Sequence, residues 1–108
     1  ETQMEPQDEK ENHIRVRTHP GEILKDELDA LGLSVNEFAR RLGVDTPRIN
    51  EIVHCRRGVT PDTAFRLAQY FGGDPIVWLN LQTKHDLSKY EREYGETTKL
   101  EVRVPASA

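Results

Sequence analysis

The sequence predicts an all-α domain of five helices, and three observations support that fold class. Apolar residues recur at three- and four-residue spacing through the middle of the chain, beginning with Leu24, Leu28 and Leu31. Prolines stand in the first turns of four of the five predicted helices and glycines follow the last turns, which are the favoured places for both. The chain has 108 residues and is 35% hydrophobic, which suffices for one modest core.

The first two helices have clear start and stop signals. The first is expected at about 20–31, opened by a proline and closed by Gly32. The second follows a capping box, in which the Ser34 hydroxyl and the Glu37 carboxylate would each satisfy a backbone N–H. This helix is expected to reach Leu42, where Gly43 supplies a left-handed residue.

The remaining three helices carry signals of the same kind. The third is expected within 45–57, with an aspartate cap, an early proline and an Arg-Gly pair at its end. The fourth is expected within 60–72, between a Thr-Pro start and a Gly-Gly stop. An Asp-Pro pair opens the fifth and longest helix, which is expected to end before Gly95.

The two ends of the chain differ from its middle. Residues 1–13 are polar and acidic, and we expect them to form a disordered lead-in. Apolar and polar residues alternate at 14–17 and at 100–104, which predicts a short strand at each place. These strands could pair with one another or add to the sheet edge of a partner. The expected organisation is therefore a lead-in, one domain at 14–95 and a tail at 96–108.

The net charge of −4 is unevenly distributed. Five acidic residues against one lysine give the first thirteen residues a charge of −4, so the remainder of the chain is neutral. The window 34–60 nevertheless holds five arginines against three carboxylates, a local excess of two positive charges. Arginine forks onto phosphates and guanines, so this window is compatible with nucleic-acid binding.

Composition also excludes several classes of protein. No stretch approaches the ~18 consecutive apolar residues of a membrane-spanning helix, so no membrane association and a cytoplasmic location are expected. The lone Cys55 forms no internal disulfide, and the four histidines lack the spacing of a metal site. We expect no cofactor, no metal and no enzymatic activity. His54 and Cys55 are expected to have a structural role, or His54 a phosphate contact.

The second and third helices have the lengths and the short connection of a helix-turn-helix. Ala39 is small where the two helices would cross, and Gly43 permits a tight turn. Val44, Ile49 and Ile52 would lock the third helix against the second, leaving it as a rod that can enter the major groove. An ordinary helical hairpin inside an all-α core is the alternative interpretation of this spacing.

Several motifs go beyond a generic helix-turn-helix. They are His19-Pro20-Gly21-Glu22-Ile23-Leu24, Leu42-Gly43-Val44, Arg48-Ile49-Asn50-Glu51, Arg57-Gly58 with Thr60, Thr63-Ala64-Phe65-Arg66-Leu67-Ala68, and Trp78-Leu79-Asn80-Leu81-Gln82 with Asp86-Leu87. Through these motifs residues 19–95, about 70% of the chain, resemble the HigA-type antitoxins of the Xre/Cro family of helix-turn-helix regulators.

The resemblance implies a lambda-repressor-like bundle with short extended or disordered termini. It also implies a homodimer that binds a palindromic operator in its own promoter and neutralises a HigB toxin, a RelE-like mRNA interferase. Pro47 departs from the family, which usually carries a longer polar residue at this position. Because proline donates no hydrogen bond, we expect only apolar contact there, such as with a thymine methyl group.

Two groups of residues are expected to contact DNA. Base edges would be read from the start of the third helix, by Thr46, Pro47, Arg48, Asn50 and Glu51. Phosphates would be held by Ser34, by the backbone N–H of Val35, and by Asn36, Arg41, Arg56, Arg57 and Thr60. Arg48 could take either a guanine or a phosphate.

Dimerisation is expected on the last two helices, through Phe71, Trp78 and Leu81, because a domain of this size cannot easily bury all of them together with Tyr90. An internal role for Trp78 is the alternative. Three functions remain open: an antitoxin that represses its own operon, a free-standing Xre-family repressor without a toxin, and an interaction protein with a vestigial helix-turn-helix.

Overall fold

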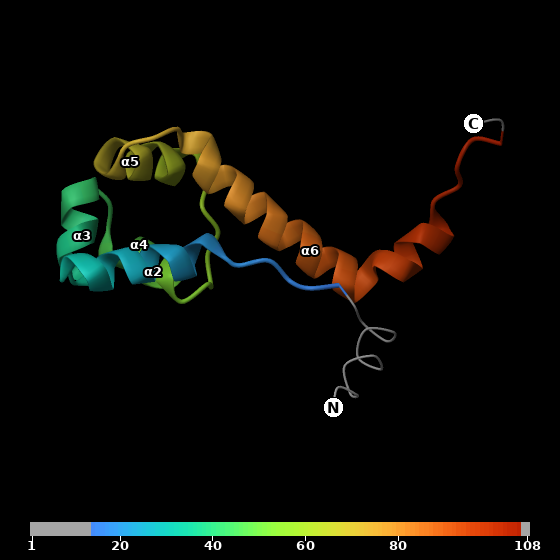
Figure 1. The fold of residues 1–108 in the computed structure, drawn as a ribbon, viewed down its shortest axis with the longest axis horizontal. Helices are drawn as coiled ribbons and strands as arrows, with labels where there is room; N and C mark the ends of the chain where they lie inside the picture. Colours follow the sequence, from blue (N-terminus) through green and yellow to red (C-terminus); the bar gives the residue numbers. More distant parts are fainter. Residues whose placement is uncertain (1–13, 107–108) are drawn as a thin grey trace, which may run out of the picture. The chain divides into compact units, whose positions relative to one another are not determined.

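The computed structural model describes residues 14–106, and over this range the chain forms helices and no strand. The predicted lead-in at 1–13 lies outside the described residues. The helices, coloured along the chain in Figure 1, are α2 (Pro20–Leu31), α3 (Val35–Leu42), α4 (Thr46–Val53), α5 (Pro61–Phe71) and α6 (Pro75–Glu101). The predicted fold class, an all-α helix-turn-helix bundle of five helices, is confirmed over these residues.

The chain divides into two compact units. One is the helical unit Thr18–Lys84, which contains α2 to α5 and the first part of α6. Among the described residues, the other joins 14–17 to 85–106. In this second unit the Arg17 backbone N–H donates to the Ser88 hydroxyl over 2.8 Å, and the Arg17 carbonyl lies 2.7 Å from Nδ1 of His85. The proposed site lies wholly within the helical unit.

The predicted caps set the helix starts. Ser34, Asp45 and Thr60 each accept a hydrogen bond from the backbone N–H three residues ahead, over 3.1, 3.4 and 3.4 Å. The reciprocal half of the capping box was predicted wrongly. The Glu37 carboxylate pairs with Arg40 and Arg41 on the next turn. Its ion pairs with two guanidinium groups replace the single hydrogen bond that the backbone of Ser34 offered.

Two helix ends differ from the prediction. The third helix was expected to continue to Arg57, but α4 ends at Val53 because Cys55 adopts left-handed backbone with φ 60°. The fifth was expected to stop at Gly95, but α6 continues through Glu101. A glycine inside a helix costs only about 1 kcal/mol, which its neighbours offset. Tyr90 and Thr98 are hydrogen bonded across the glycine over 2.6 Å.

The two predicted strands are therefore wrong. Leu100 and Glu101 form the last turn of α6, and no strand follows among the described residues. At 14–17 the backbone is irregular and is held by hydrogen bonds to side chains of α6 rather than by a neighbouring strand. Alternation over four or five residues is a weak signal because a strand also needs a partner edge.

The core of the helical unit draws on every one of its helices. Its fully buried large side chains are Leu24, Phe38, Ile49, Ile52, Leu67 and Pro20. Trp78 of α6 closes this core, with 9% of its surface exposed. Its ring centroid lies 6.2 Å from that of Phe71. Burying a large apolar side chain contributes about 1.5–3 kcal/mol, so this cluster is the main source of stability of the unit.

The start of α2 approaches the end of α4 very closely. Nδ1 of the buried His19 accepts a hydrogen bond from the Gly21 N–H over 2.8 Å and so caps α2. A Cβ atom built on Gly21 would lie 1.8 Å from the carbonyl oxygen of Ile52. The glycine of the His-Pro-Gly motif is therefore required for the contact between two backbones.

We predict that Gly21→Ala destabilises the protein by about 2 kcal/mol or more, because the new methyl group would displace α4. Gly32→Ala is the matched control, since its Cβ meets nothing within 4 Å and only its left-handed φ of 69° opposes the change. That control should lose about 1 kcal/mol. Urea unfolding measures both free energies, and equal losses would contradict the steric explanation.

Candidate nucleic-acid interface

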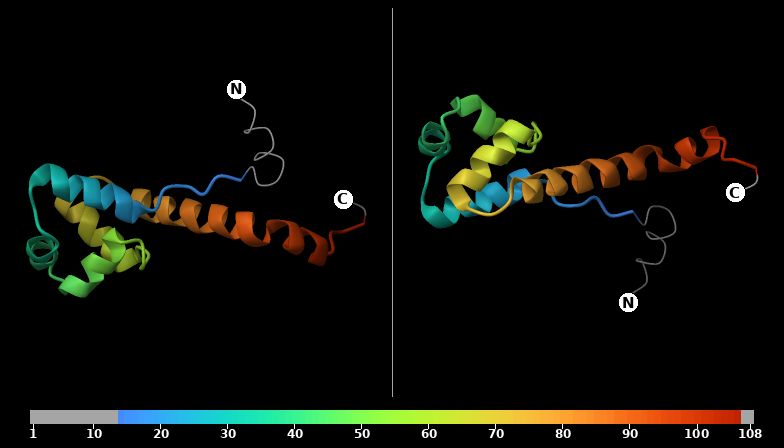
Figure 2. Two further views of the ribbon diagram at one scale, coloured as in Figure 1. Left: turned by 90° about the horizontal axis from the view of Figure 1, so that it is seen from below. Right: turned by 90° about the horizontal axis from the view of Figure 1, so that it is seen from above.

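The connection between α3 and α4 is a tight glycine turn. Gly43 has φ 76°, and its N–H donates to the Arg40 carbonyl over 3.2 Å. The Val44 N–H donates to the Ala39 carbonyl over 3.0 Å, so two carbonyls of the last turn of α3 are satisfied by the turn itself. Figure 2 shows the result, with α3 viewed nearly end-on and α4 from the side. The two helices cross steeply, as a helix-turn-helix requires.

One side of α4 faces the core and the other faces outward. Ile49, Ile52 and Val53 are buried, whereas Pro47 is exposed. Thr46, Pro47, Asn50 and Glu51 share the opposite side of the helix by their spacing, and we call these four residues the outer face of α4. The structure therefore brings together four of the five residues predicted to read bases.

A side-chain bond joins the first turns of α3 and α4. The Thr46 hydroxyl donates to Oδ1 of Asn36 over 2.5 Å. Thr46 belongs to the predicted base-reading residues and Asn36 to the predicted phosphate contacts, and the bond between them was not predicted. The bond holds the Asn36 amide beside the outer face of α4, within reach of the same ligand.

The predicted DNA-contacting arginines are mostly paired with carboxylates. Arg57 pairs with Glu51 of the outer face over 2.8 Å. Nε of Arg41 bonds Glu37 over 3.0 Å and its Nη1 bonds the Tyr70 hydroxyl over 2.9 Å. The Arg41 hydrogen bond holds the pKa of the Glu37 carboxyl below its ordinary value. These exposed pairs orient the guanidinium groups but contribute little stability.

Arg56 differs from these arginines. Its side chain is exposed, and within residues 14–106 it makes no ion pair. It follows the left-handed Cys55, which turns the chain away from the end of α4.

Desolvation, followed by the nearby Glu22 carboxylate, raises the pKa of the Cys55 thiol, although the residue as a whole is exposed. The thiol is therefore mainly protonated at neutral pH.

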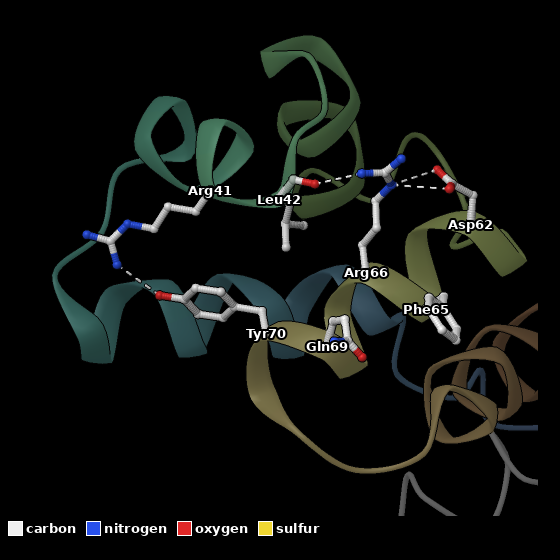
Figure 3. Close-up of a pocket in the computed structure, with 7 residues that line it drawn as sticks. All are labelled: Arg41, Leu42, Asp62, Phe65, Arg66, Gln69 and Tyr70. Atoms are coloured by element: carbon white, nitrogen blue, oxygen red, sulfur yellow. Dashed lines mark hydrogen bonds and ion pairs between the residues drawn. The ribbon is translucent and has the colours of Figure 1, made fainter.

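A groove of about 450 Å³ lies between the end of α3 and the exposed side of α5. Figure 3 shows the residues that line it: Arg41, Leu42, Asp62, Phe65, Arg66, Gln69 and Tyr70. Arg66 crosses the groove to donate to the Leu42 carbonyl over 2.8 Å. Asp62 also bonds Arg48 of α4, and this hydrogen bond holds the pKa of Asp62 below its ordinary value.

The residues predicted to form a dimer interface lie at the core of the helical unit. Trp78 is buried, and Phe71 and Leu81 are half-buried and pack against the same core. Their role between two copies of the chain stays a prediction. Ile76 and Val77, on the first turn of α6, are about half exposed.

Gln82 is a positioning residue that the sequence analysis missed. Its side-chain oxygen accepts a hydrogen bond from the buried Val59 N–H over 2.8 Å. A Cβ on Gly58 would lie 3.1 Å from the Gln82 side chain, so the loop after α4 rests on this amide. This loop contains Arg57 and Thr60, both predicted phosphate contacts. The signal was present in the last motif, Trp78 to Gln82, which no generic helix-turn-helix explains.

This arrangement defines a helix-turn-helix protein, with α3 and α4 as the two helices of the motif. Residues 24–78 match the model of the helix-turn-helix family. Virulence-associated protein I of Dichelobacter nodosus is 54% identical over 76 residues, which are 69% of this chain and 70% of that protein.

Two solved structures have the same fold. An addiction module antidote protein of the HigA family from Coxiella burnetii has TM-score 0.80 and 39% identity, over 84% of this chain and 100% of that one. The Pseudomonas aeruginosa antitoxin HigA with higBA promoter has TM-score 0.77 and 38% identity, over 82% and 97%. The chain belongs to the Xre/Cro helix-turn-helix family and, within it, to the HigA-type regulators.

Within the part of the chain that the structure describes, no helix combines the length and the apolar content needed to cross a bilayer. Over the same residues, no group of three or more histidine, cysteine or carboxylate side chains is arranged to hold a metal ion.

We predict that Gln82→Leu destabilises the protein by about 1–3 kcal/mol, because it leaves the buried Val59 N–H without its acceptor. Asn80→Leu, an exposed position on the same helix, should change stability by less than about 0.5 kcal/mol. Thermal unfolding of the two variants provides the comparison. A Gln82→Leu protein as stable as Asn80→Leu would show that the loop does not depend on this bond.

Proposed function

We propose that the chain is a DNA-binding antitoxin of the HigA type, which represses its own operon and neutralises a RelE-like mRNA interferase. The observation that supports DNA binding best is the anchoring of α4: three buried apolar residues fix its inner side, while the residues of its outer face are half-buried or exposed. A helix held in this way can enter the major groove without losing its orientation. The solved HigA relative with promoter DNA supports the same use of the fold.

The proposed roles follow from position. Base edges are contacted by Thr46, Pro47, Asn50 and Glu51. Asn50 pairs with adenine, and Glu51 accepts a hydrogen bond from cytosine. Phosphates are held at the start of α3 by Ser34, Val35 and Asn36. Further phosphate contacts come from Arg41 of α3 and from Arg56, Arg57 and Thr60 in the loop after α4. Glu51 can accept from cytosine only where its pairing with Arg57 leaves an oxygen available. The Arg57 pairing therefore orients a base-reading carboxylate.

Two copies of the chain would bind a palindromic operator, because one recognition helix contacts too few bases for high specificity. We place the dimer interface on α5 and the first part of α6, around Phe71, Trp78 and Leu81 and the exposed Ile76 and Val77 beside them. DNA binding and dimerisation then reside in one domain, within residues 14–95. A repressor of this kind acts in the cytoplasm.

Neutralisation of a toxin is the second part of this proposal, beyond DNA binding. The alternative is a free-standing repressor without a toxin, which would use the same outer face of α4. The HigA-type relatives favour the antitoxin, since they include a protein described as an addiction module antidote.

We predict that Arg56→Ala combined with Arg57→Ala weakens binding to all DNA sequences alike. It should flatten the slope of log K against log salt by up to about two units, since each lost phosphate contact removes about 0.9. Lys25→Ala, at an exposed position of α2, is the control and should leave the slope unchanged. An unchanged slope in the double variant, measured by titrating promoter DNA at several salt concentrations, would refute the phosphate role.

For the toxin, we predict that the product of an adjacent reading frame co-purifies with the chain when the two are co-expressed. The chain should also relieve the growth arrest which that product causes alone. A Thr46→Ala, Asn50→Ala variant should lose operator binding and keep the relief of growth arrest. Operator binding without any co-purifying partner would favour the free-standing repressor.

A further inference from the structure

The recognition helix meets α5 through a polar contact in addition to the apolar core that the two helices share. Nη1 of Arg48, on the first turn of α4, lies 2.5 Å from Oδ2 of Asp62, on the first turn of α5. The same nitrogen also donates to the Thr63 hydroxyl over 3.4 Å. Thr63 is buried and the Arg48 side chain is 29% exposed, so Arg48 points toward α5 and not away from the protein.

Asp62 has a second arginine partner, which extends the contact to α3. Nε of Arg66 donates to both carboxylate oxygens of Asp62, over 3.1 and 3.2 Å. Nη1 of Arg66 donates to the carbonyl of Leu42, the last residue of α3. Figure 3 shows Arg66 between these two partners, with the carboxylate on one side and the carbonyl on the other. The residues Arg48, Asp62 and Arg66 thus form one connected unit, which we call the polar clamp.

The polar clamp joins both helices of the helix-turn-helix to a third helix. Through Arg48 it holds the start of α4, and through Arg66 it holds the end of α3, so the turn between them is fixed from both sides. Burial of Ile49 and Ile52 determines which side of α4 faces inward, but apolar contacts are not directional. The hydrogen bonds of Arg48 and Arg66 are directional, and they can set the tilt of α4 within that packing.

A base-reading role for Arg48 conflicts with this geometry. To reach a guanine, the guanidinium would have to leave both Asp62 and Thr63. The hydrogen bond from Arg48 also lowers the pKa of the Asp62 carboxyl, because it stabilises the ionised form of that group. Arg48 and Asp62 therefore stabilise one another as a pair in the DNA-free protein.

We propose that the polar clamp determines operator specificity by fixing the orientation of α4, and that Arg48 is a positioning residue rather than a base-reading one. This inference rests on the proposed DNA binding. It assigns a role in specificity to Asp62 and Arg66 of α5, neither of which belongs to the outer face of α4.

The test compares Asp62→Ala with Asp29→Ala in the full-length chain. Each variant removes one exposed carboxylate and its ion pairing, but the Lys25–Asp29 pair lies within α2 and joins no helices. Affinities are measured for a duplex of the chain's own promoter and for a shuffled duplex of the same composition. We expect the ratio of the two affinities to fall roughly tenfold in Asp62→Ala, comparable to one mismatched base pair. The ratio should be unchanged in Asp29→Ala.

Arg48→Met distinguishes positioning from phosphate binding, because it removes the charge and keeps an unbranched apolar side chain. The clamp predicts a lower affinity ratio with an unchanged salt slope. A phosphate contact predicts instead a slope that is smaller by about 0.9 and an unchanged ratio, which would overturn the inference. Tighter binding of Asp62→Ala to both duplexes with an unchanged ratio would also overturn it, since Asp62 would then only compete with phosphate.

Hydrogen exchange in the DNA-free protein separates failure of the clamp from failure of the proposed function. The amides of α4 should exchange faster in Asp62→Ala than in Asp29→Ala, while the amides of α2 should exchange at the same rate in both variants. Equal exchange in α4 would overturn the clamp whatever the DNA result. If the unmodified chain does not distinguish the two duplexes, the proposed function fails, and faster exchange in α4 would still support the clamp as a structural device.

Discussion

Burial of the inner side of α4 is the constraint on which the remaining structure depends. Ile49 and Ile52 are completely buried, and each contributes about 1.5–3 kcal/mol that is lost if α4 rotates. The Ile52 carbonyl also lies where any side chain on Gly21 would collide with it, so α2 can approach only as glycine allows. The outer face of α4 is fixed because the inner side has no alternative place to pack.

The helices could be predicted largely from local chemistry. Ser34, Asp45 and Thr60 cap helices where the sequence places them, since a cap depends only on residues three positions away. The errors lie where local signals are ambiguous. Arg57-Gly58 resembles a helix end, yet the backbone already becomes left-handed at Cys55. Cysteine has no preference for this conformation, so the sequence does not predict it. Gly95 resembles a stop, yet α6 continues through it.

The candidate site was predictable in its faces and not in its pairings. Helical periodicity suffices to place Pro47 and Asn50 opposite Ile49 and Ile52, because it depends on one helix alone. The pairing of Arg48 with Asp62 spans fourteen residues and requires the packing of two helices, so spacing alone could not show it. For the same reason spacing alone left both an interface role and an internal role open for Trp78, which packs in the core of its own chain.

The separation between the two sides of α4 has a consequence for how such proteins diversify. Pro47 is exposed, and substitutions at such surface positions usually change stability by less than about 0.5 kcal/mol. Under the proposed function, new operator preferences can therefore arise at Pro47 without compensating changes in the core. Gene duplicates with one shared scaffold could in this way acquire separate target promoters within a single genome, each insulated from the others.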